Sequence, residues 1–445
     1  MVLQLGGQNR GRVHRHCCNT RPTKLSFICS IGAAHCGNVN IRDSKHSDPR
    51  RPAFVSVVTE TFPPEVNGVA HSIARFCAGM ITRGVALQIV RPRQSGESDP
   101  PQCPQARHVL VEGLTLPNYP QVRLGLPANA LLEKSWSLER PDGVHIVTEG
   151  PLGWSALHVA RKLGIPVTSS FHTNFQGYAS HYGAGILTRA VTAYLRHFHN
   201  RTNLTFVPTA QLRDELAGRG FRNLAVVGRG VDTGLFNPGL RSDALRFRLG
   251  VAGNAPLVLH VGRLAPEKNL KVLFDAFERI QRHRPDARLV VVGDGPQRAA
   301  LAREHPDCRF TGMLTGNVLA EHYASADLFL YPSLTETFGN VTLEAMASGL
   351  AVVAFDYAAA REHIRHMENG ISVPFGDAKG FAEMASVIVR SPIRMQMLRQ
   401  EARVTAERLD WENIIDRFVE EISGAVSAQG RARNMAQRAD SAVTA

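Results

Sequence analysis

The sequence lacks any long uncharged apolar run. No stretch approaches the roughly 20 residues that a helix needs to cross a bilayer, so the sequence predicts no transmembrane helix. Residues 1–50 also lack an apolar core followed by a small-residue cleavage site, so we do not interpret them as a signal peptide. With 44% hydrophobic and 20% charged residues over 445 positions, the composition is that of a globular protein with two domains and flanking segments.

Little net charge remains once the ends of the chain are set aside. The formal charge is +12, but residues 1–51 supply +7 and the segment from Gly430 another +2, which leaves +3 for the rest. A nucleic-acid footprint needs a concentrated basic patch, so we expect no nucleic-acid partner. We expect residues 1–51 to be a disordered basic extension and residues 429–445 a disordered tail.

The seven cysteines show no metal-ligand spacing. Four lie in the first 51 residues, close to His14 and His16, and Cys77, Cys103 and Cys308 are scattered singly. A flexible tail explains the first group better than a zinc site does, and the whole pattern fits a reducing cytosol. We therefore expect a cytoplasmic protein without a bound metal.

From Phe54 onward, short β-branched runs alternate with amphipathic stretches, which is typical of a parallel sheet wrapped by helices. The pattern restarts after a Gly-punctuated turn at 226–232. We predict an α/β fold with one doubly wound domain over 52–228, a second over 229–409, and a helix over 410–428. The predicted strands are 54–59, 85–91, 144–148, 166–171 and 204–208, then 257–261, 289–292, 310–311, 328–331, 351–355 and 371–373.

In such sheets ligands bind beyond the carboxyl ends of the strands, and two loops of the second half carry suitable chemistry. After strand 257–261, Arg263 and Lys268 place two cations beside a helix start, where a diphosphate is the natural partner. A solvated cationic loop is the alternative. After strand 328–331, Glu336 and Glu344 form a Glu-x7-Glu pair, and two carboxylates suit the hydroxyls of a hexose and a ribose. A solvent-facing position is the alternative for Glu344.

Three further positions follow strands. Gly68, after the first strand, allows backbone amides to approach a phosphate. His172 ends a strand at its carboxyl side, where a ligand-facing residue belongs, although a lone histidine is often structural. The run 293–296, Gly-Asp-Gly-Pro, has no third glycine at the required place, so it is not a dinucleotide fingerprint, and an oxidoreductase is disfavoured.

The combination of these motifs resembles the large family of retaining glycosyltransferases called family four. The likeness covers about residues 53–425 and rests on Gly-Arg at 262–263, Glu-Lys-Asn at 267–269, the run 293–296 and the two glutamate segments 336–339 and 344–349. Within that family, the chain resembles bacterial GDP-mannose-dependent alpha-mannosyltransferases and related glycolipid glycosyltransferases. The resemblance implies a GT-B fold, with two facing Rossmann-like domains and a C-terminal helix crossing back to the first.

Carried over position by position, the resemblance implies that Arg263 and Lys268 bind the donor diphosphate. Glu344 would bind the ribose, and Glu336 would hold the transferred sugar. The other donor-binding positions that it implies in this loop are the amides of Thr337, Phe338, Gly339, Asn340 and Val341.

The resemblance also assigns residues of the first domain. His172 would lie beside the reacting sugar, and Gly68 would contact the diphosphate from the opposite domain. Many members have a second glycine where this chain has Asn67, which leaves the shape of that loop open.

The sequence contains no Asp-x-Asp pair, so we expect Arg263 and Lys268 to replace a metal ion, and no cofactor. The family resemblance implies transfer on the face from which the leaving group departs, with Glu336 positioning the sugar. Double displacement with Glu336 as nucleophile is the alternative mechanism. Alternative functions are a UDP-sugar-dependent glycolipid synthase (glucosyl, glucuronosyl or sulfoquinovosyl diacylglycerol type), a nucleotide-sugar epimerase, and a silent sugar-nucleotide binding protein.

The helix predicted over 186–199 has a pattern that would suit an enzyme whose acceptor is a lipid. Its apolar residues follow one face, while Arg189, Arg196 and His199 fall largely on the other. Such a helix can lie on an anionic membrane surface, which would place the enzyme on the inner face of the plasma membrane. The alternative is an ordinary helix that packs its apolar face, including Leu187, Tyr194 and Phe198, onto the sheet.

Overall fold

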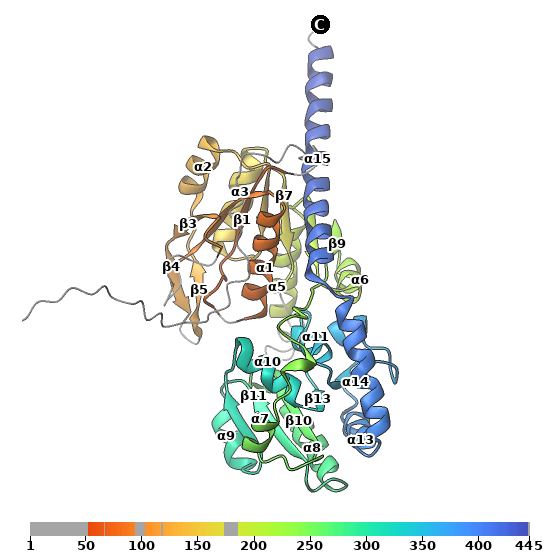
Figure 1. Cartoon of the computed structure of the whole chain (residues 1–445). Helices are drawn as coiled ribbons and strands as arrows, with labels where there is room; N and C mark the ends of the chain where they lie inside the picture. The colour runs from red at the N-terminus through yellow and green to blue at the C-terminus, as the bar shows by residue number, and fades with distance from the viewer. Residues whose placement is uncertain (1–51, 66, 94–102, 117–118, 173–185, 444–445) are drawn as a thin grey trace, which may run out of the picture. The chain divides into compact units, whose positions relative to one another are not determined.

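The computed structural model describes residues 52–65, 67–93, 103–116, 119–172 and 186–443. It contains two parallel sheets covered by helices (Figure 1). This confirms the predicted two-domain, Rossmann-like α/β fold. The extension over 1–51, with its cysteines and histidines, lies outside the described residues.

The first sheet has the order β3-β2-β1-β6-β7-β8-β9, and all its strands are parallel. Sequence reasoning missed β3, β9 and the antiparallel pair β4-β5 beside this sheet. The strands are β1 (Phe54–Val58), β2 (Ala86–Pro92), β3 (Arg107–Val111), β4 (Gly113–Leu116), β5 (Tyr119–Gly125), β6 (Gly143–Ile146), β7 (Val167–Ser170), β8 (Leu204–Val207) and β9 (Leu224–Val226). The helices are α1 (Gly68–Thr82), α2 (Asn129–Leu138), α3 (Pro151–Lys162), α5 (Ile186–His199) and α6 (Ala210–Gly218).

The second sheet has the order β12-β11-β10-β13-β14-β15. Its strands are β10 (Leu257–Val261), β11 (Arg288–Val292), β12 (Arg309–Gly312), β13 (Leu328–Tyr331), β14 (Ala351–Phe355) and β15 (Ile371–Val373). The helices are α7 (Asp243–Arg248), α8 (Leu270–Gln281), α9 (Arg298–Glu304), α10 (Gly316–Ser325), α11 (Asn340–Ala347), α12 (Ala358–His363), α13 (Ala378–Val389), α14 (Pro392–Glu407) and α15 (Trp411–Val443), with 3-10 turns η1 (Pro238–Leu240) and η2 (Pro266–Lys268).

The strands of the second sheet are nearly continuous apolar runs because both faces are covered. Leu259 and Phe329 belong to the core on one face, whereas Val258 and Leu330 belong to the core on the other. All four side chains are fully buried. Two-sided burial is the usual state of a parallel sheet, and it fixes the strands whose carboxyl ends carry the candidate loops.

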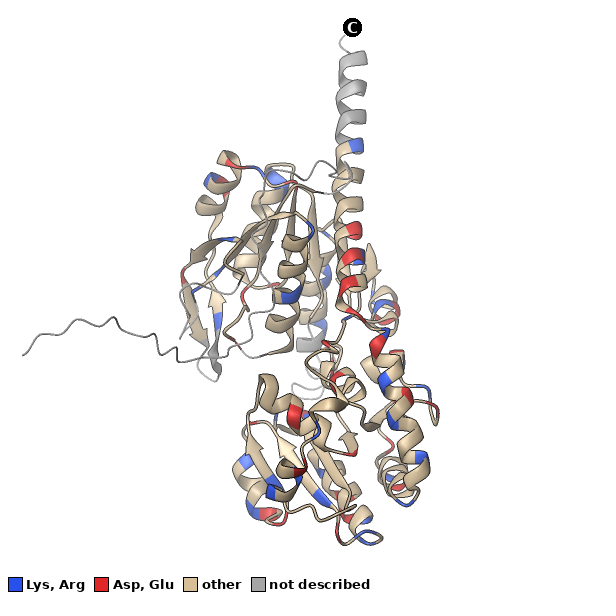
Figure 2. Cartoon of the chain, in the orientation of Figure 1, with Lys and Arg blue, Asp and Glu red and all other residues tan. Residues whose placement is uncertain are grey.

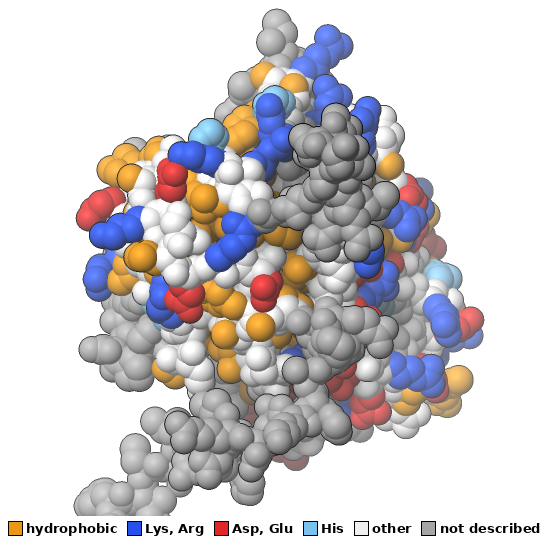
Figure 3. All heavy atoms as spheres, turned by 90° about the horizontal axis from the view of Figure 1, so that it is seen from above, with side chains coloured by type: hydrophobic (Ala, Val, Ile, Leu, Met, Phe, Trp, Pro, Cys, Tyr) orange, Lys and Arg blue, Asp and Glu red, His pale blue; other side chains and the backbone are white. Residues whose placement is uncertain are grey.

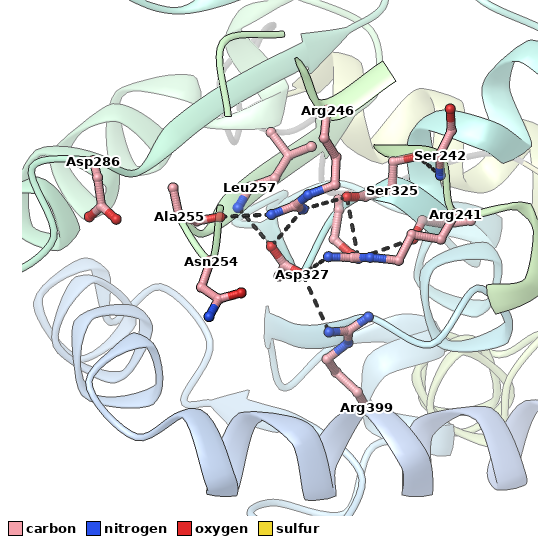
Figure 4. Close-up of polar contacts among 12 residues, drawn as sticks. Arg241, Ser242, Arg246, Asn254, Ala255, Leu257, Asp286, Ser325, Asp327 and Arg399 are labelled. Atoms are coloured by element: carbon pink, nitrogen blue, oxygen red, sulfur yellow. Dashed lines mark hydrogen bonds and ion pairs between the residues drawn. The ribbon is translucent and has the colours of Figure 1, made fainter. Parts of the chain in front are cut away.

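The opposite ends of β10 and β13 are joined through one buried carboxylate, that of Asp327 (Figure 4). Arg241, Arg246 and Arg399 approach its oxygens at 2.8, 3.0 and 3.3 Å, and the Leu257 amide donates to it at 2.9 Å. Burial opposes ionisation of this carboxyl, but the amide and the three guanidinium groups hold its pKa below the ordinary value. Asp327 therefore ties the segment before β10 and helix α14 to both strands.

The last helix, α15, packs on the first domain. Trp411, Ile415 and Phe418 lie in the same core cluster as α1 residues such as Phe76, which stacks on Phe418 at 4.3 Å. The helix returns to the first domain as predicted, but it is longer than the expected 410–428. Its backbone stays helical to Val443, within the segment expected to be a disordered tail.

Helix α5 follows the expected amphipathic pattern only in part. His199, expected on the polar face, is fully buried, and its ring nitrogens contact Glu149 at 3.1 Å and Ser169 at 2.9 Å. Leu195 and Phe198 are buried too, while Tyr194 remains 43% exposed. The later turns of α5 therefore pack onto the sheet, and the side chain of Leu187 lies outside the described residues.

Across the described elements, acidic and basic side chains are interspersed (Figure 2). On the described part of the face seen from above, basic side chains lie among apolar and acidic ones (Figure 3). Among the described residues, no helix is both long enough and apolar enough to span a membrane.

Candidate functional site

The two loops singled out from the sequence follow neighbouring strands. β10 pairs in parallel with β13, so the loops after Val261 and Tyr331 leave the same edge of the sheet. Lys268 in the first loop contacts the Glu336 carboxylate in the second. The structure thus brings together two residues that lie far apart in the sequence.

The carboxylate of Glu336 receives three donors on one oxygen. Besides Lys268, the Tyr331 hydroxyl donates to Oε1 at 2.5 Å and the Ser333 hydroxyl at 2.7 Å. The Tyr357 hydroxyl donates to the backbone carbonyl of Glu336 at 2.8 Å. The loop before α11 is therefore held through both the main chain and the side chain of Glu336.

Arg263 lies in the same loop as Lys268 but is more exposed. Its guanidinium group is 3.6 Å from the Glu267 carboxylate, and 48% of its side chain is exposed. About half of the Arg263 side chain is therefore accessible to solvent, in the same loop as Lys268.

Helix α11 begins directly after this loop. Gly339 precedes it with a φ of +89°, a left-handed conformation that disfavours any side chain. Gly339 has no side chain that could cap the helix start, and the Phe338 ring beside it is buried. The Thr342 amide donates to the Gly339 carbonyl at 3.0 Å. Among the described residues no side chain accepts from the amides of Asn340 and Val341, so these two can bind an anion or a hydroxyl oxygen.

Glu344 lies on the first turns of α11. The Tyr323 hydroxyl donates to its Oε2 at 2.9 Å. Burial raises the pKa of Glu344 to about 7, although the tyrosine hydrogen bond acts in the opposite direction. The solvent-facing alternative is wrong for this residue, because its side chain is largely buried and bonds to a buried phenol.

The third loop supports the first through two glycines. A Cβ on Gly293 would lie 1.9 Å from the Gly262 carbonyl oxygen, and one on Gly295 would lie 2.4 Å from that of Leu264. The Leu264 amide also donates to the Asp294 carbonyl at 2.9 Å. The glycines therefore serve close backbone packing against the loop that carries Arg263.

His172 follows β7, at the edge expected from the sequence. The Arg229 guanidinium approaches its Nδ1 at 3.5 Å, and its carbonyl accepts a 2.8 Å bond from the Thr337 hydroxyl. Burial lowers the pKa of His172 well below its ordinary value, and Arg229, His145 and His199 lower it further. The ring is therefore neutral at physiological pH.

Gly68 is the first residue of α1, and Asn67 caps that helix. The Asn67 side-chain oxygen accepts from the amides of Val69 at 3.0 Å and Ala70 at 2.8 Å. The φ of Asn67, −150°, is ordinary extended backbone, so position 67 does not need a glycine. A Cβ on Gly68 would have the side chain of Asn340 as its neighbour, at 3.7 Å.

Comparison with known proteins gives a consistent result. The family described as Glycosyltransferase Family 4 matches residues 66–235, and Glycosyl transferases group 1 matches residues 255–390. A GDP-mannose-dependent alpha-mannosyltransferase of Mycolicibacterium smegmatis is 35% identical over 74% of this chain and 85% of its own length. The sulfoquinovosyl transferase SQD2 of Arabidopsis thaliana is 30% identical over 82% of this chain and 72% of its own length.

The chain belongs to glycosyltransferase family 4. It is a hexosyltransferase. The fold of this glycosyltransferase is that of the Anabaena protein Alr3699/HepE in complex with UDP and glucose, with a TM-score of 0.66, 18% identity, and coverage of 84% of this chain and 100% of the other.

Sequence reasoning missed residues of this glycosyltransferase that touch the predicted ones. Tyr331 and Tyr323 contact Glu336 and Glu344, but buried aromatic residues in strands and helices look like ordinary core. Glu60, two residues after the end of β1, was also missed. Burial raises its pKa to about 7, while a hydrogen bond from the Leu152 amide opposes the shift. Its signal in the sequence was its place at the carboxyl end of a strand.

Proposed function

We propose that this glycosyltransferase moves an alpha-mannosyl residue from GDP-mannose to a glycolipid or glycan acceptor, with retention and without a metal ion. The observation that carries the proposal is the 35% identity to the M. smegmatis GDP-mannose-dependent enzyme over most of its length. The Lys268–Glu336 contact and the uncapped start of α11 support a donor site at the edge of the second sheet.

The proposed roles follow the chemistry of each group. Arg263 and Lys268 neutralise charge that builds on the departing diphosphate, and the α11 amides add hydrogen bonds to it. Glu336 holds the transferred sugar, and Glu344 holds the ribose. His172 and Gly68 complete the site from the first domain.

In the proposed reaction the acceptor oxygen bonds to the anomeric carbon on the face from which the diphosphate leaves. The donor's own phosphate oxygen takes the acceptor proton, so no protein nucleophile is required. Glu336 has three donors on Oε1, which suits a carboxylate that orients a substrate.

A second candidate is a UDP-sugar-dependent glycolipid synthase. The 30% identity to the Arabidopsis sulfoquinovosyl transferase favours it. Both candidates fit a lipid acceptor, and both are compatible with a peripheral position on the inner face of the plasma membrane. The exposed Arg189 and Arg196 of α5 support such a position.

The deciding experiment supplies purified full-length protein with GDP-mannose, UDP-glucose or UDP-sulfoquinovose, with and without extracted lipid. We expect GDP release only with GDP-mannose, faster with lipid, and an alpha-linked product by NMR. Release of UDP instead would establish the second candidate, a beta-linked product would contradict retention, and interconversion of free nucleotide sugars would indicate an epimerase.

A further inference from the structure

Two buried tyrosines each bond to one glutamate of the Glu-x7-Glu pair. Tyr331, at the end of β13, donates to Glu336 Oε1 at 2.5 Å, and Tyr323, on α10, donates to Glu344 Oε2 at 2.9 Å. Tyr331 is 6% exposed and Tyr323 is fully buried. Both site glutamates are thus oriented from within the core of the second domain.

In each glutamate the bonds leave one carboxylate oxygen uncommitted. Lys268, Tyr331 and Ser333 all bond to Oε1 of Glu336, and within the described residues no hydrogen bond or ion pair reaches its Oε2. The same holds for Oε1 of Glu344, since Tyr323 bonds to Oε2. Neither uncommitted oxygen is among the described buried atoms without a partner, so both are accessible.

The tyrosine rings cannot easily turn away from the glutamates. The Tyr331 ring is stacked with those of His260 and Phe329, whose centres lie 5.9 and 5.7 Å away. Tyr323 lies against the same Phe329 at 5.7 Å and meets Phe236 edge-on at 5.5 Å. Close-packed aromatic neighbours restrict ring orientation, so each hydroxyl keeps its direction.

His260 completes this support beneath the site. It is fully buried on β10, and its Nδ1 bonds to the Leu330 carbonyl at 2.9 Å, which fixes the ring against Tyr331. Burial lowers the pKa of His260 to about 4, and burial raises the pKa of both phenols well above the ordinary value. The stack is therefore uncharged, and both hydroxyls stay protonated donors at physiological pH.

We propose that Tyr331 and Tyr323 are positioning residues, each of which fixes one oxygen of a site glutamate so that the other oxygen faces a hydroxyl of the nucleotide sugar. The proposal rests on the proposed function. Glu336 presents Oε2 to the transferred sugar, and Glu344 presents Oε1 to the ribose. The two tyrosines then affect different kinetic constants, because one acts on the reacting sugar and the other on the nucleotide.

The test compares Tyr331→Phe with Tyr323→Phe, which remove only a hydroxyl from rings that stay packed. We expect Tyr331→Phe to lower kcat about tenfold with donor KM within about twofold, since it removes the hydrogen bond to Glu336 and a longer one, at 3.5 Å, from Lys268. We expect Tyr323→Phe to raise donor KM about tenfold with kcat within about twofold. Each variant serves as the control for the other, because both lose a buried phenol hydroxyl.

A double-mutant cycle separates positioning from simple packing. In a Glu336→Ala background, which removes the acceptor of the Tyr331 hydroxyl, Tyr331→Phe should change kcat by less than about twofold. An equal loss with and without Glu336, or unchanged constants in either single variant, would overturn the proposal. Calorimetry with GDP and UDP gives an independent readout for Tyr323→Phe. If the wild type binds a nucleotide but transfers no sugar, the proposed function fails. In that case, weaker nucleotide binding by Tyr323→Phe still supports the positioning role of Tyr323, and unchanged binding refutes it.

Discussion

Lys268 contacts the Glu336 carboxylate in the structure, whereas the proposed function assigns it to the donor diphosphate. An ammonium group carries three N–H donors, so it can hold the carboxylate and a phosphate oxygen together. Such a bridge would place the transferred sugar and the leaving group on one fixed cation. The charge of Lys268 is then needed for the reaction itself.

We therefore predict that Lys268→Ala and Arg263→Ala each lower turnover about a hundredfold, as is typical when a preorganised donor to a developing charge is removed. Lys271→Ala is the matched control, because Lys271 is 83% exposed and pairs with Asp275 on α8. Wild-type activity should survive a strong chelator. Loss of activity with EDTA and its recovery with magnesium or manganese would contradict the metal-free mechanism.

The two glutamates should separate binding from turnover. We predict that Glu344→Ala raises the donor KM about tenfold with little change in kcat, because the ribose contact is the same in ground and transition states. Glu336→Ala should lower kcat more than it changes KM. Steady-state kinetics with varied donor measures both, and equal effects on both constants at both sites would refute the division.

The raised pKa of Glu344 also predicts a pH dependence of stability. Burial raises its pKa to about 7, so the folded state favours the protonated form. Ionising this carboxyl in the folded state lowers the free energy of unfolding. This loss is absent below the pKa of an unfolded glutamate, grows as the pH rises toward 7, and is complete above pH 7. Relative to Glu344→Gln, the wild type should lose up to about 3 kcal/mol between pH 4 and pH 8. Denaturant unfolding of both proteins at four pH values measures this loss. If their free energies of unfolding change with pH in parallel, the Glu344 carboxyl titrates normally.

At the scale of elements, the contact of α15 with α1 depends on a missing side chain. A Cβ on Gly79 would lie 2.3 Å from Ile415 Cδ1 and 2.7 Å from its Cγ2, whereas Gly218 at the end of α6 has nothing within 4 Å. We predict that Gly79→Ala destabilises by roughly 1–3 kcal/mol through overpacking. Gly218→Ala is the control and should be neutral or stabilising by up to about 1 kcal/mol. Equal unfolding midpoints for the two variants would mean that α15 does not press on α1.

The strands of the second sheet were predicted best because burial on both faces makes them short continuous apolar runs, as in Leu257–Val261 and Leu328–Tyr331. β3 and the β4-β5 pair were missed because they carry mixed polar residues beside a Pro-rich segment. Helix α5 was located correctly, but His199 was misplaced, since helical spacing cannot reveal that Glu149 and Ser169 bond to it.

The candidate site could be predicted because ligands bind at loops that follow the carboxyl ends of parallel strands. Applying this rule needs only the order of strands and helices along the sequence. The structure adds two facts that the order of elements cannot give. Lys268 contacts Glu336, and Asn67 caps α1 at the position where many family members have a second glycine. Contacts of Tyr331 and Tyr323 with the glutamates depend on the register of β13 and the rotation of α10. Those details are set by packing across the sheet and are invisible in one sequence.

At the scale of the whole molecule, the basic residues of α5 bear on attachment to a membrane. Arg189 and Arg196 are exposed, although Arg196 also donates to the Arg219 carbonyl at 3.0 Å. We predict that the full-length protein floats with vesicles of anionic lipid at low salt and is released as salt increases. Arg189→Glu with Arg196→Glu should weaken this binding.

The matched control reverses two exposed charges elsewhere, with Arg279→Glu and Arg282→Glu on α8. If the control weakens vesicle binding as much as the α5 variant, attachment reflects overall charge. If the wild type stays unbound at low salt, the acceptor is reached without membrane attachment.

The first domain cannot finish its core until the last helix has been made. Val55 and Val57 of β1 share a core cluster with Ile415 and Phe418 of α15. At roughly 5–20 residues per second, a ribosome needs about 20 to 70 s to translate the chain from β1 to α15. During that time the second domain is synthesised while an apolar face of the first remains uncovered, which makes the nascent chain a substrate for chaperones. A chain truncated anywhere before Trp411 would therefore lack part of the core of its first domain, although that domain is synthesised first.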